Sequence, residues 1–229
     1  MGGNHMYDKY NWRFNDEVVK VFDEHVKKSV PLYQLFHKDI LDMSVYFVQN
    51  NTNVIDIGTS TGVLLKGLYD INKSRNARYI GIDIEEAMIN ECNNRYKDME
   101  FKICDALDYD YSNSSVITAM LSFQFIPKKE RVEILRKIYN GLNEDGAFFM
   151  VEKIKNNIPD IHDIYNDIYY DFKRENIKDE EILDKNISLR GIMKPLTLEE
   201  NISNLKEVGF NKIDIFMKYN NFVGIIAIK

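Results

Sequence analysis

From Asn53 onward, short apolar runs alternate with stretches in which apolar residues recur at helical spacing. The runs are rich in Val, Ile and Phe and end in an acid or a small-residue turn, as buried strands often do. They predict strands at 53–58, 77–83, 100–105, 115–121 and 146–152. Between these strands the spacing predicts helices at 62–71, 85–96 and 128–141. Such alternation favours a mostly parallel sheet with helices on both faces.

The pattern changes after Glu152. Residues 160–190 are rich in charge and Tyr and have a helical pattern, so we expect 155–195 to be a helical insertion after the fifth strand. A final helix is predicted to begin near Thr197. The tail NKIDIFMKYNNFVGIIAIK then contains two strands separated only by a Tyr-Asn-Asn turn. This tail predicts a C-terminal antiparallel hairpin and brings the expected sheet to seven strands.

The length of 229 residues and the 45% hydrophobic content suffice for one hydrophobic core. We therefore expect one α/β domain over residues 1–229. Residues 7–50 precede the first strand and are expected to form a helical cap, because apolar residues follow helical spacing there at Phe14, Val18, Val21 and Phe22.

The charge and the cysteine content limit the classes of partner that the protein is expected to bind. The formal net charge is -6, with Lys and Arg dispersed, so no continuous basic stripe is present and direct nucleic-acid binding is disfavoured. Cys92 and Cys104 stand without a cluster of His or Cys, which indicates neither a metal site nor a disulfide framework. No apolar run approaches the roughly 18 residues of a membrane span. We expect a cytoplasmic protein with a small-molecule substrate and no membrane partner.

The turn after the first strand is the first candidate site, within VIDIGTSTGVLLKGL at 54–68. Ligands of open parallel sheets bind outside the carboxyl ends of the strands. Asp56, Gly58, Ser60 and Gly62 fall there, and the glycines permit a sharp turn close to a ligand while the next helix presents free N–H groups. As a dinucleotide fingerprint the stretch is poor, because Ser60 replaces the middle glycine and no third glycine follows.

Acids also end the next two strands. Asp83 closes the second strand, where a carboxylate can accept the hydroxyls of a ribose, and Asp105 with the amide of Ala106 closes the third, beside the expected adenine edge. Each acid has a structural alternative, since strand-terminal Asp residues often cap a helix or bind loop amides. Three acids together with the glycine turn favour an adenosyl ligand.

Several longer stretches resemble one family. They are FDEHVKKSVPLY (22–33), DIGTSTG (56–62), GIDIEEAMI (81–89), FQFIPKKERVEILRKIYNGLNEDGA (123–147), YDFKREN (170–176) and LKEVGF (205–210). From about Trp12 onward the chain resembles class I S-adenosylmethionine-dependent methyltransferases, in particular the branch of carboxy-S-adenosylmethionine synthases used in tRNA wobble-uridine modification. The resemblance implies a Rossmann-like class I methyltransferase fold, S-adenosyl-L-methionine as cofactor and a homodimer.

The resemblance also implies ligand contacts for particular residues. Tyr33 would contact the ligand from the cap, and Gly58, Thr59 and Ser60 would hold its methionine part. Ile84 and Glu85 would flank the ribose and adenine, and Asp105 with Ala106 would close over the base. The synthases of this branch take a carboxyl group from prephenate and place it on the cofactor.

Two positions depart from that branch. Asn186 stands where the synthases have an arginine that grips the new carboxylate, and Met120 stands where they have an asparagine beside the ligand. Neither side chain can replace a guanidinium fork. Arg190 and Arg174 are candidates to compensate. The departures favour in-line methyl transfer to a small-molecule acceptor, with the prephenate-dependent synthase, other non-methylating chemistry on the cofactor, and ligand binding without turnover as alternatives.

The acceptor side is less defined. Tyr33, Tyr169 and Arg174 are the catalytic candidates, although no catalytic base can be named. Other candidates for lining the acceptor space are Phe123, Gln124, Tyr165 and Tyr170. The spacing of Tyr165, Tyr169 and Phe172 favours a helix-packing core over a role in the acceptor space. Glu152 and Lys153 either face the ligand edge or form an ordinary ion pair.

Overall fold

The computed structural model describes residues 16–229. Phe14 and the rest of residues 7–15 of the predicted cap lie outside the described residues. The strands are β1 Asn53–Ile57, β2 Arg78–Asp83, β3 Glu100–Ile103, β4 Ser114–Met120, β5 Leu142–Lys153, β6 Lys212–Tyr219 and β7 Phe222–Ile228. The helices are α2 Asp16–Ser29, α3 Tyr33–Ser44, α4 Val63–Asn72, α5 Glu86–Arg95, α6 Lys128–Gly141, α7 Pro159–Arg174, α8 Asp179–Ser188 and α9 Leu198–Val208, with a short 3-10 turn at Phe123–Phe125.

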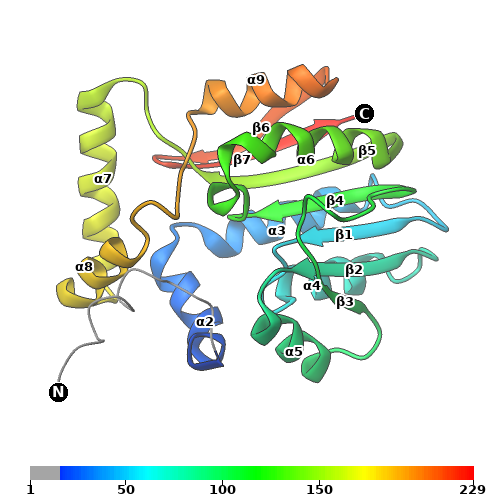
Figure 1. Cartoon of the computed structure of the whole chain (residues 1–229), viewed down its shortest axis with the longest axis horizontal. Coiled ribbons are helices and arrows are strands. Elements are labelled where there is room, and N and C mark those ends of the chain that lie inside the picture. The colour runs from blue at the N-terminus through cyan, green and yellow to red at the C-terminus, as the bar shows by residue number, and fades with distance from the viewer. Residues whose placement is uncertain (1–15) are drawn as a thin grey trace.

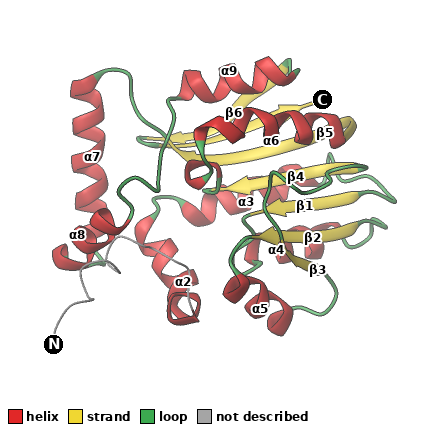
Figure 2. Cartoon of the chain, viewed as in Figure 1, coloured by secondary structure: helices red, strands yellow, loops and turns green. Residues whose placement is uncertain are grey.

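The seven strands form one sheet in the order β3-β2-β1-β4-β5-β7-β6 (Figures 1 and 2). β1 to β5 are parallel, whereas β7 pairs antiparallel with β5 and β6 antiparallel with β7. The mostly parallel sheet and its closing hairpin are confirmed. Strand order reverses between β1 and β4, which is where ligands bind in open α/β sheets.

β5 is longer than the apolar pattern predicts. It begins at Leu142 rather than at 146, because Ser114 pairs with Leu142 before the register shifts and Val116 pairs with Ala147. The four residues before Gly146 include Asn143, which is polar, so this part of the strand carries no apolar signal.

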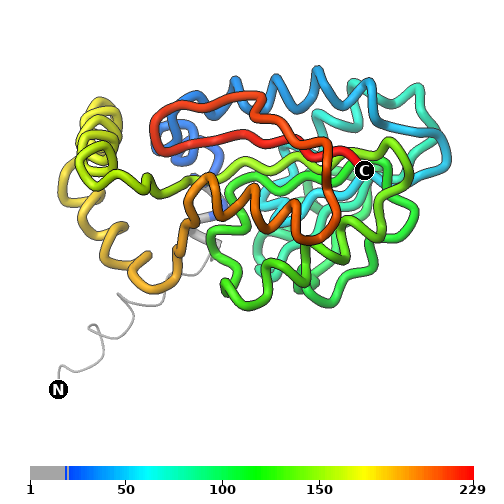
Figure 3. Tube along the Cα trace, turned by 90° about the horizontal axis from the view of Figure 1, so that it is seen from above, coloured from blue at the N-terminus to red at the C-terminus, as the bar shows by residue number. Residues whose placement is uncertain are grey.

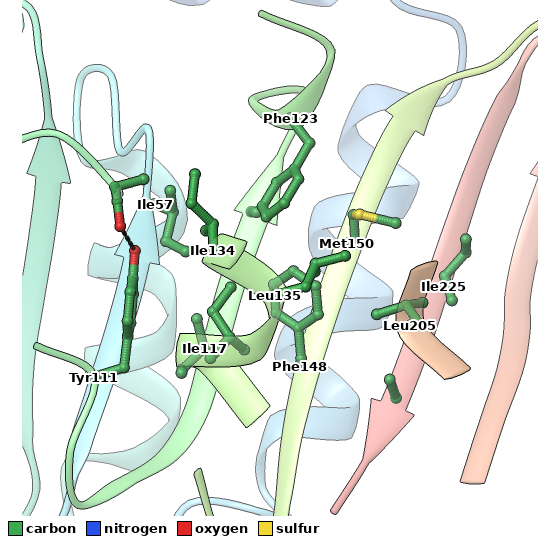
Figure 4. Close-up of a cluster of buried hydrophobic side chains, with 14 of the residues drawn as sticks. Ile57, Tyr111, Ile117, Phe123, Ile134, Leu135, Phe148, Met150, Leu205 and Ile225 are labelled. Carbon is green, nitrogen blue, oxygen red and sulfur yellow. Dashed lines mark hydrogen bonds between the residues drawn. The ribbon is translucent and has the colours of Figure 1, made fainter. Parts of the chain in front are cut away.

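The sheet is covered on both faces, and alternate strand residues enter two different clusters. Ile117 and Phe148 pack with Leu135 of α6 and Leu205 of α9 on one face (Figure 4). On the other face the neighbouring strand residues pack against α3, α4 and α5. Leu65 of α4 is one of the helix residues in this cluster. Strands buried on both faces read as continuous apolar runs, which is why the sequence predicts them well.

α2, α7 and α8 lie beyond the carboxyl ends of the parallel strands (Figures 1 and 3). The predicted cap from 16 onward and the predicted insertion are thus both helical and both stand at the edge where a ligand is expected. None of the described helices is long and apolar enough to cross a membrane.

Candidate cofactor and substrate site

A cavity of about 320 Å³ opens at the carboxyl ends of the parallel strands. Its size is within the range of small-molecule sites, roughly 300–1,000 Å³. α2 and α3 contribute to one side, and β5, α7 and α8 to another. All the predicted cofactor-binding residues except Gly62 line it: Tyr33, Asp56, Gly58, Thr59, Ser60, Asp83, Ile84, Glu85, Asp105, Ala106 and Met120.

The loop after β1 is held in a left-handed path. Gly58 has φ 65° and Ser60 φ 50°, and the N–H groups of Gly58 and Thr59 both donate to the carbonyl of Ile82, at 2.8 and 3.0 Å. A Cβ added to Gly58 would lie 2.4 Å from Ser122 Oγ. The loop therefore requires glycine at 58, and the left-handed Ser60 is a strained position of the kind that gathers at ligand sites.

Gly62 has a packing role instead. It is the N-cap of α4, with φ 76°, and a Cβ there would approach Tyr96, Cys92 and Phe101 at 3.0–3.2 Å. Gly62 does not line the cavity; it faces α5 and β3 and lets α4 begin close to them, and its contact with the cofactor stays a prediction.

Asp83 ties two loops together. One carboxylate oxygen accepts the N–H of Ser60 at 3.0 Å and the other accepts the N–H of Glu85 at 3.0 Å. Burial raises the pKa of Asp83. The loop-binding alternative thus describes part of what this residue does. A carboxylate has about four lone-pair sites, so capacity for a ribose hydroxyl is left.

Asp56 and Asp105 differ from Asp83 in their surroundings. Asp56 is 2% exposed and accepts a hydrogen bond from Thr118 Oγ1 at 2.6 Å. Burial raises its pKa to about 6. Asp105 is exposed and accepts the N–H of Leu107 at 2.8 Å. Asp56 is thus a buried residue next to the loop after β1, whereas Asp105 is an exposed residue at the open edge of the cavity.

An apolar platform lies between these acids. Ile84 is 65% exposed although it stands between Asp83 and Glu85 in the cavity wall. A flat base stacked there would remove an exposed apolar side chain from water. Acceptors at the ends of β2 and β3 with an apolar surface between them fit an adenosyl group.

The two tyrosine candidates line the cavity from α3 and α7, and both are neutral. Burial raises the pKa of the hydroxyl in both Tyr33 and Tyr169. The Tyr33 ring packs against His37 at a centroid distance of 4.5 Å, and Tyr169 packs against Phe222 at 5.4 Å. Burial lowers the pKa of His37 to about 4. None of these groups is an ionised base near neutral pH.

Arg174, a predicted catalytic candidate, does not line the cavity. It is exposed and pairs with Asp171 at 3.0 Å and Asp179 at 2.9 Å. The last turn of α7 directs it to solvent. Arg190 is also exposed and outside the cavity wall. Asn186 does line the cavity and donates a hydrogen bond to Tyr170 Oη at 3.0 Å, with neither arginine beside it in this wall.

The other candidates for lining the acceptor space divide in the same way. Gln124 and Tyr169 line the cavity, whereas Phe123, Tyr165 and Tyr170 are absent from its lining. Phe123 is 2% exposed and belongs to the core under α6.

Glu152 and Lys153 do not form an ion pair with each other. Neighbouring residues of a strand point to opposite faces. Glu152 is 3% exposed and accepts the N–H of Phe123 at 2.9 Å, and burial raises its pKa to about 8. Lys153 lines the cavity, so of the two alternatives the ligand edge holds for this lysine.

Two further lysines of the cavity wall were not among the sequence-based candidates. Lys173 comes from α7 and Lys185 from α8, and both line the cavity with Lys153. The available signal was weak: a lysine on a charged helix is normally solvated.

Comparison with known proteins identifies the family. The methyltransferase domain family matches residues 48–207. The chain belongs to this family. It is also 45% identical over 227 residues to a carboxy-S-adenosyl-L-methionine synthase of Staphylococcus epidermidis, covering 97% of this chain and 99% of that protein. A synthase of the same name from Nautilia profundicola is 37% identical over 223 residues, covering 95% of this chain and 94% of that protein.

Solved structures of other methyltransferases share the fold. Human N-acetylserotonin methyltransferase in complex with S-adenosylmethionine matches with a TM-score of 0.62 at 12% identity, over 94% of this chain and 56% of that one. A methyltransferase described as putative and S-adenosylmethionine-dependent, from Methanococcus maripaludis, matches with a TM-score of 0.62 at 19% identity, over 99% of this chain and 96% of that one. The predicted fold, the enzyme family and its cofactor, S-adenosylmethionine, are confirmed.

Proposed function

We propose that this enzyme is a carboxy-S-adenosylmethionine synthase, which binds S-adenosylmethionine and transfers to its methyl carbon a carboxyl group taken from prephenate. The observation that carries the proposal is a single cavity in which acids at the ends of β1, β2 and β3 face lysines from β5, α7 and α8. Such a cavity suits a cationic cofactor together with an anionic co-substrate. Two relatives of this name match over almost the entire chain.

Asp83, Ile84 and Glu85 would take the nucleoside, and the loop from Gly58 to Ser60 would take the methionine part. In the proposed reaction prephenate loses its ring carboxyl group and its hydroxyl group and becomes aromatic. The carboxyl group replaces one methyl hydrogen of S-adenosylmethionine, and that hydrogen leaves with the hydroxyl group as water. The protein mainly aligns the two reactants and excludes solvent, and alignment contributes up to roughly 7–11 kcal/mol in favourable models.

Methyl transfer to a small acceptor is the second candidate. The observation in its favour is Asn186, an uncharged side chain already engaged with Tyr170. On this reading the lysines would orient an anionic acceptor instead of a carboxyl donor.

Mass spectrometry separates the two functions. The enzyme is incubated with S-adenosylmethionine, with and without prephenate and with a panel of small acceptors. The synthase gives an adenosyl product heavier by one carbon dioxide, only with prephenate. S-adenosylhomocysteine formed only with an acceptor would replace this proposal by methyl transfer, and products from S-adenosylmethionine alone would indicate chemistry on the cofactor itself.

We further propose a homodimeric, cytoplasmic enzyme without direct nucleic-acid contact. Ile164 and Ile168 support the dimer, because they lie one turn apart on α7 and are 51% and 41% exposed. Sedimentation velocity tests it. A single species of monomer mass at micromolar concentration would contradict the dimer.

A further inference from the structure

The lysine side of the cavity is unusual in its burial. Lys173 is only 4% exposed, and Lys153 and Lys185 are half-buried. A buried ammonium group loses hydration, and such groups are normally paired with an acid. Within residues 16–229 neither Lys153 nor Lys173 has a carboxylate within ion-pair distance.

One aromatic ring partly replaces that acid. The ammonium nitrogens of Lys153 and Lys173 lie over the Tyr169 ring, at 4.2 and 5.0 Å from its centroid. A ring face attracts cations, although less strongly than a carboxylate does. Two cations beside one ring also repel each other. The ring positions the ammonium groups and leaves most of their charge uncompensated.

The third lysine is held by a neutral partner. The Lys185 nitrogen lies 2.6 Å from Nε2 of His25 in α2. Burial, followed by the charge of Lys185, lowers the pKa of His25 to about 4, so the ring is uncharged near neutral pH. His25 fixes the position of the ammonium group and adds no negative charge.

The pKa directions agree with this geometry. Burial, and then the charge of Lys173, lowers the pKa of both Lys153 and Lys185 to about 8. Burial also lowers the pKa of Lys173. Lys173 thus lies close enough to Lys153 and Lys185 to disfavour their charge, and a bound anion would reverse that effect.

The acids at the ends of β1, β2 and β3 form no ion pair with Lys153 or Lys173. Asp56, Asp83 and Asp105 lie at the ends of β1, β2 and β3, whereas β5 is separated from β1 by β4. Asp83 and Asp105 are engaged with loop amides. The cavity therefore has one acidic side and one basic side.

We propose that Lys153 and Lys173, on the face of Tyr169, form a carboxylate subsite that, with the charge of Lys185, holds a small organic dianion beside the cofactor. This inference rests on the proposed function, since it assigns the residues that bind the carboxyl donor. No arginine lines the cavity among residues 16–229, and the lysines supply the charge from three different elements.

The test uses Lys153→Met and Lys173→Met, with Lys155→Met as the matched control. Lys155 is exposed and follows Lys153 by two residues. Calorimetry measures binding of prephenate to the complex with S-adenosylhomocysteine. Each cavity variant is expected to bind prephenate at least about tenfold more weakly than the wild type, since hydrogen bonds to charged groups are among the stronger ones. Affinity for S-adenosylhomocysteine should change less than about threefold, and the control should match the wild type.

Thermal unfolding distinguishes a binding role from a structural one. A methionine of similar length removes a buried charge, so the melting temperature of the ligand-free variants is expected to stay the same or rise. A structural lysine would give the opposite shift.

The outcomes keep the two proposals apart. If the wild type forms carboxylated product and both cavity variants bind prephenate with unchanged affinity, the proposed subsite is overturned and the proposed synthase function stands. No carboxylated product, with prephenate binding that depends on the lysines, would overturn the synthase and leave the subsite. A wild type that does not bind prephenate would overturn both.

Discussion

Gly58→Ala and Gly191→Ala form a matched pair that tests how the cofactor loop is built. Both glycines have a left-handed backbone, with φ 65° and 76°. A methyl group at Gly58 would lie 2.4 Å from Ser122 Oγ and 2.9 Å from its Cβ, whereas at Gly191 it would meet nothing within 4 Å. The pair shares the conformational cost and differs in the steric one.

The magnitudes follow from those two terms. A left-handed alanine costs about 1–2 kcal/mol, offset by about 0.4–1 kcal/mol through the less flexible unfolded chain. Gly191→Ala should therefore lower the free energy of unfolding by about 1 kcal/mol. Gly58→Ala adds an overpacking cost of about 1–3 kcal/mol, because Ser122 donates a hydrogen bond to the Ile57 carbonyl at 2.9 Å and cannot move freely.

Urea denaturation measures the free energy of unfolding, and calorimetry measures the affinity for S-adenosylhomocysteine. Gly58→Ala is expected to lose at least about tenfold in affinity, since the shifted loop carries Thr59 and Ser60. Gly191→Ala should bind normally. Equal destabilisation by the two changes would refute the steric argument, and normal binding by Gly58→Ala would refute the role of the loop.

Three further changes probe the site and its support. Glu152→Gln keeps an acceptor for the buried amide and removes the ionisation of this side chain. Burial raises the pKa of Glu152 from 4.5 to about 8. The stabilising contribution of Glu152 is therefore complete below pH 4.5 and is lost as the pH rises through 8. In denaturation series over pH, Glu152→Gln should be more stable than the wild type near pH 8.5, by an amount on the order of a few kcal/mol. Glu144→Gln, at an exposed position, is the control. Parallel stability curves of the wild type and Glu152→Gln would contradict the raised pKa of Glu152. Asp83→Asn turns an acceptor into a donor that faces an N–H group. Because charge-assisted hydrogen bonds of about 1.5–3 kcal/mol are lost, the affinity for S-adenosylhomocysteine measured by calorimetry should fall at least about tenfold. Unchanged affinity would count against a cofactor role for this loop. Asp23→Asn weakens the contact between α2 and the loop, in which Thr61 Oγ1 donates to Asp23 at 2.5 Å. Stopped-flow measurement should show faster ligand release, and an unchanged rate would contradict a role for this contact in retaining the ligand.

The fold could be predicted because its strongest signals are local. A strand such as β4 is buried on both faces, and from Val116 to Met120 only Thr118 interrupts its apolar run. The capping box at Thr197 and Glu200 fixes the start of α9 in the same local way. The cofactor side of the site also follows from strand order, since each acid stands at the end of its own strand.

The substrate side could not be predicted in that way, because it depends on where three separate elements meet. Lys153 ends a buried strand, Lys173 lies on a charged helix, and Lys185 follows on the next one. Lys173 and Lys185, each taken alone, have the sequence context of an ordinary surface lysine, and Lys153 equally suits an ion pair. Only the return of α7 and α8 over the carboxyl ends of the strands brings them to one cavity beside Tyr169. Asn186 taken alone suggested that the chain had lost its means of binding a carboxylate; the lysines around it show that positive charge in this cavity does not depend on that one position.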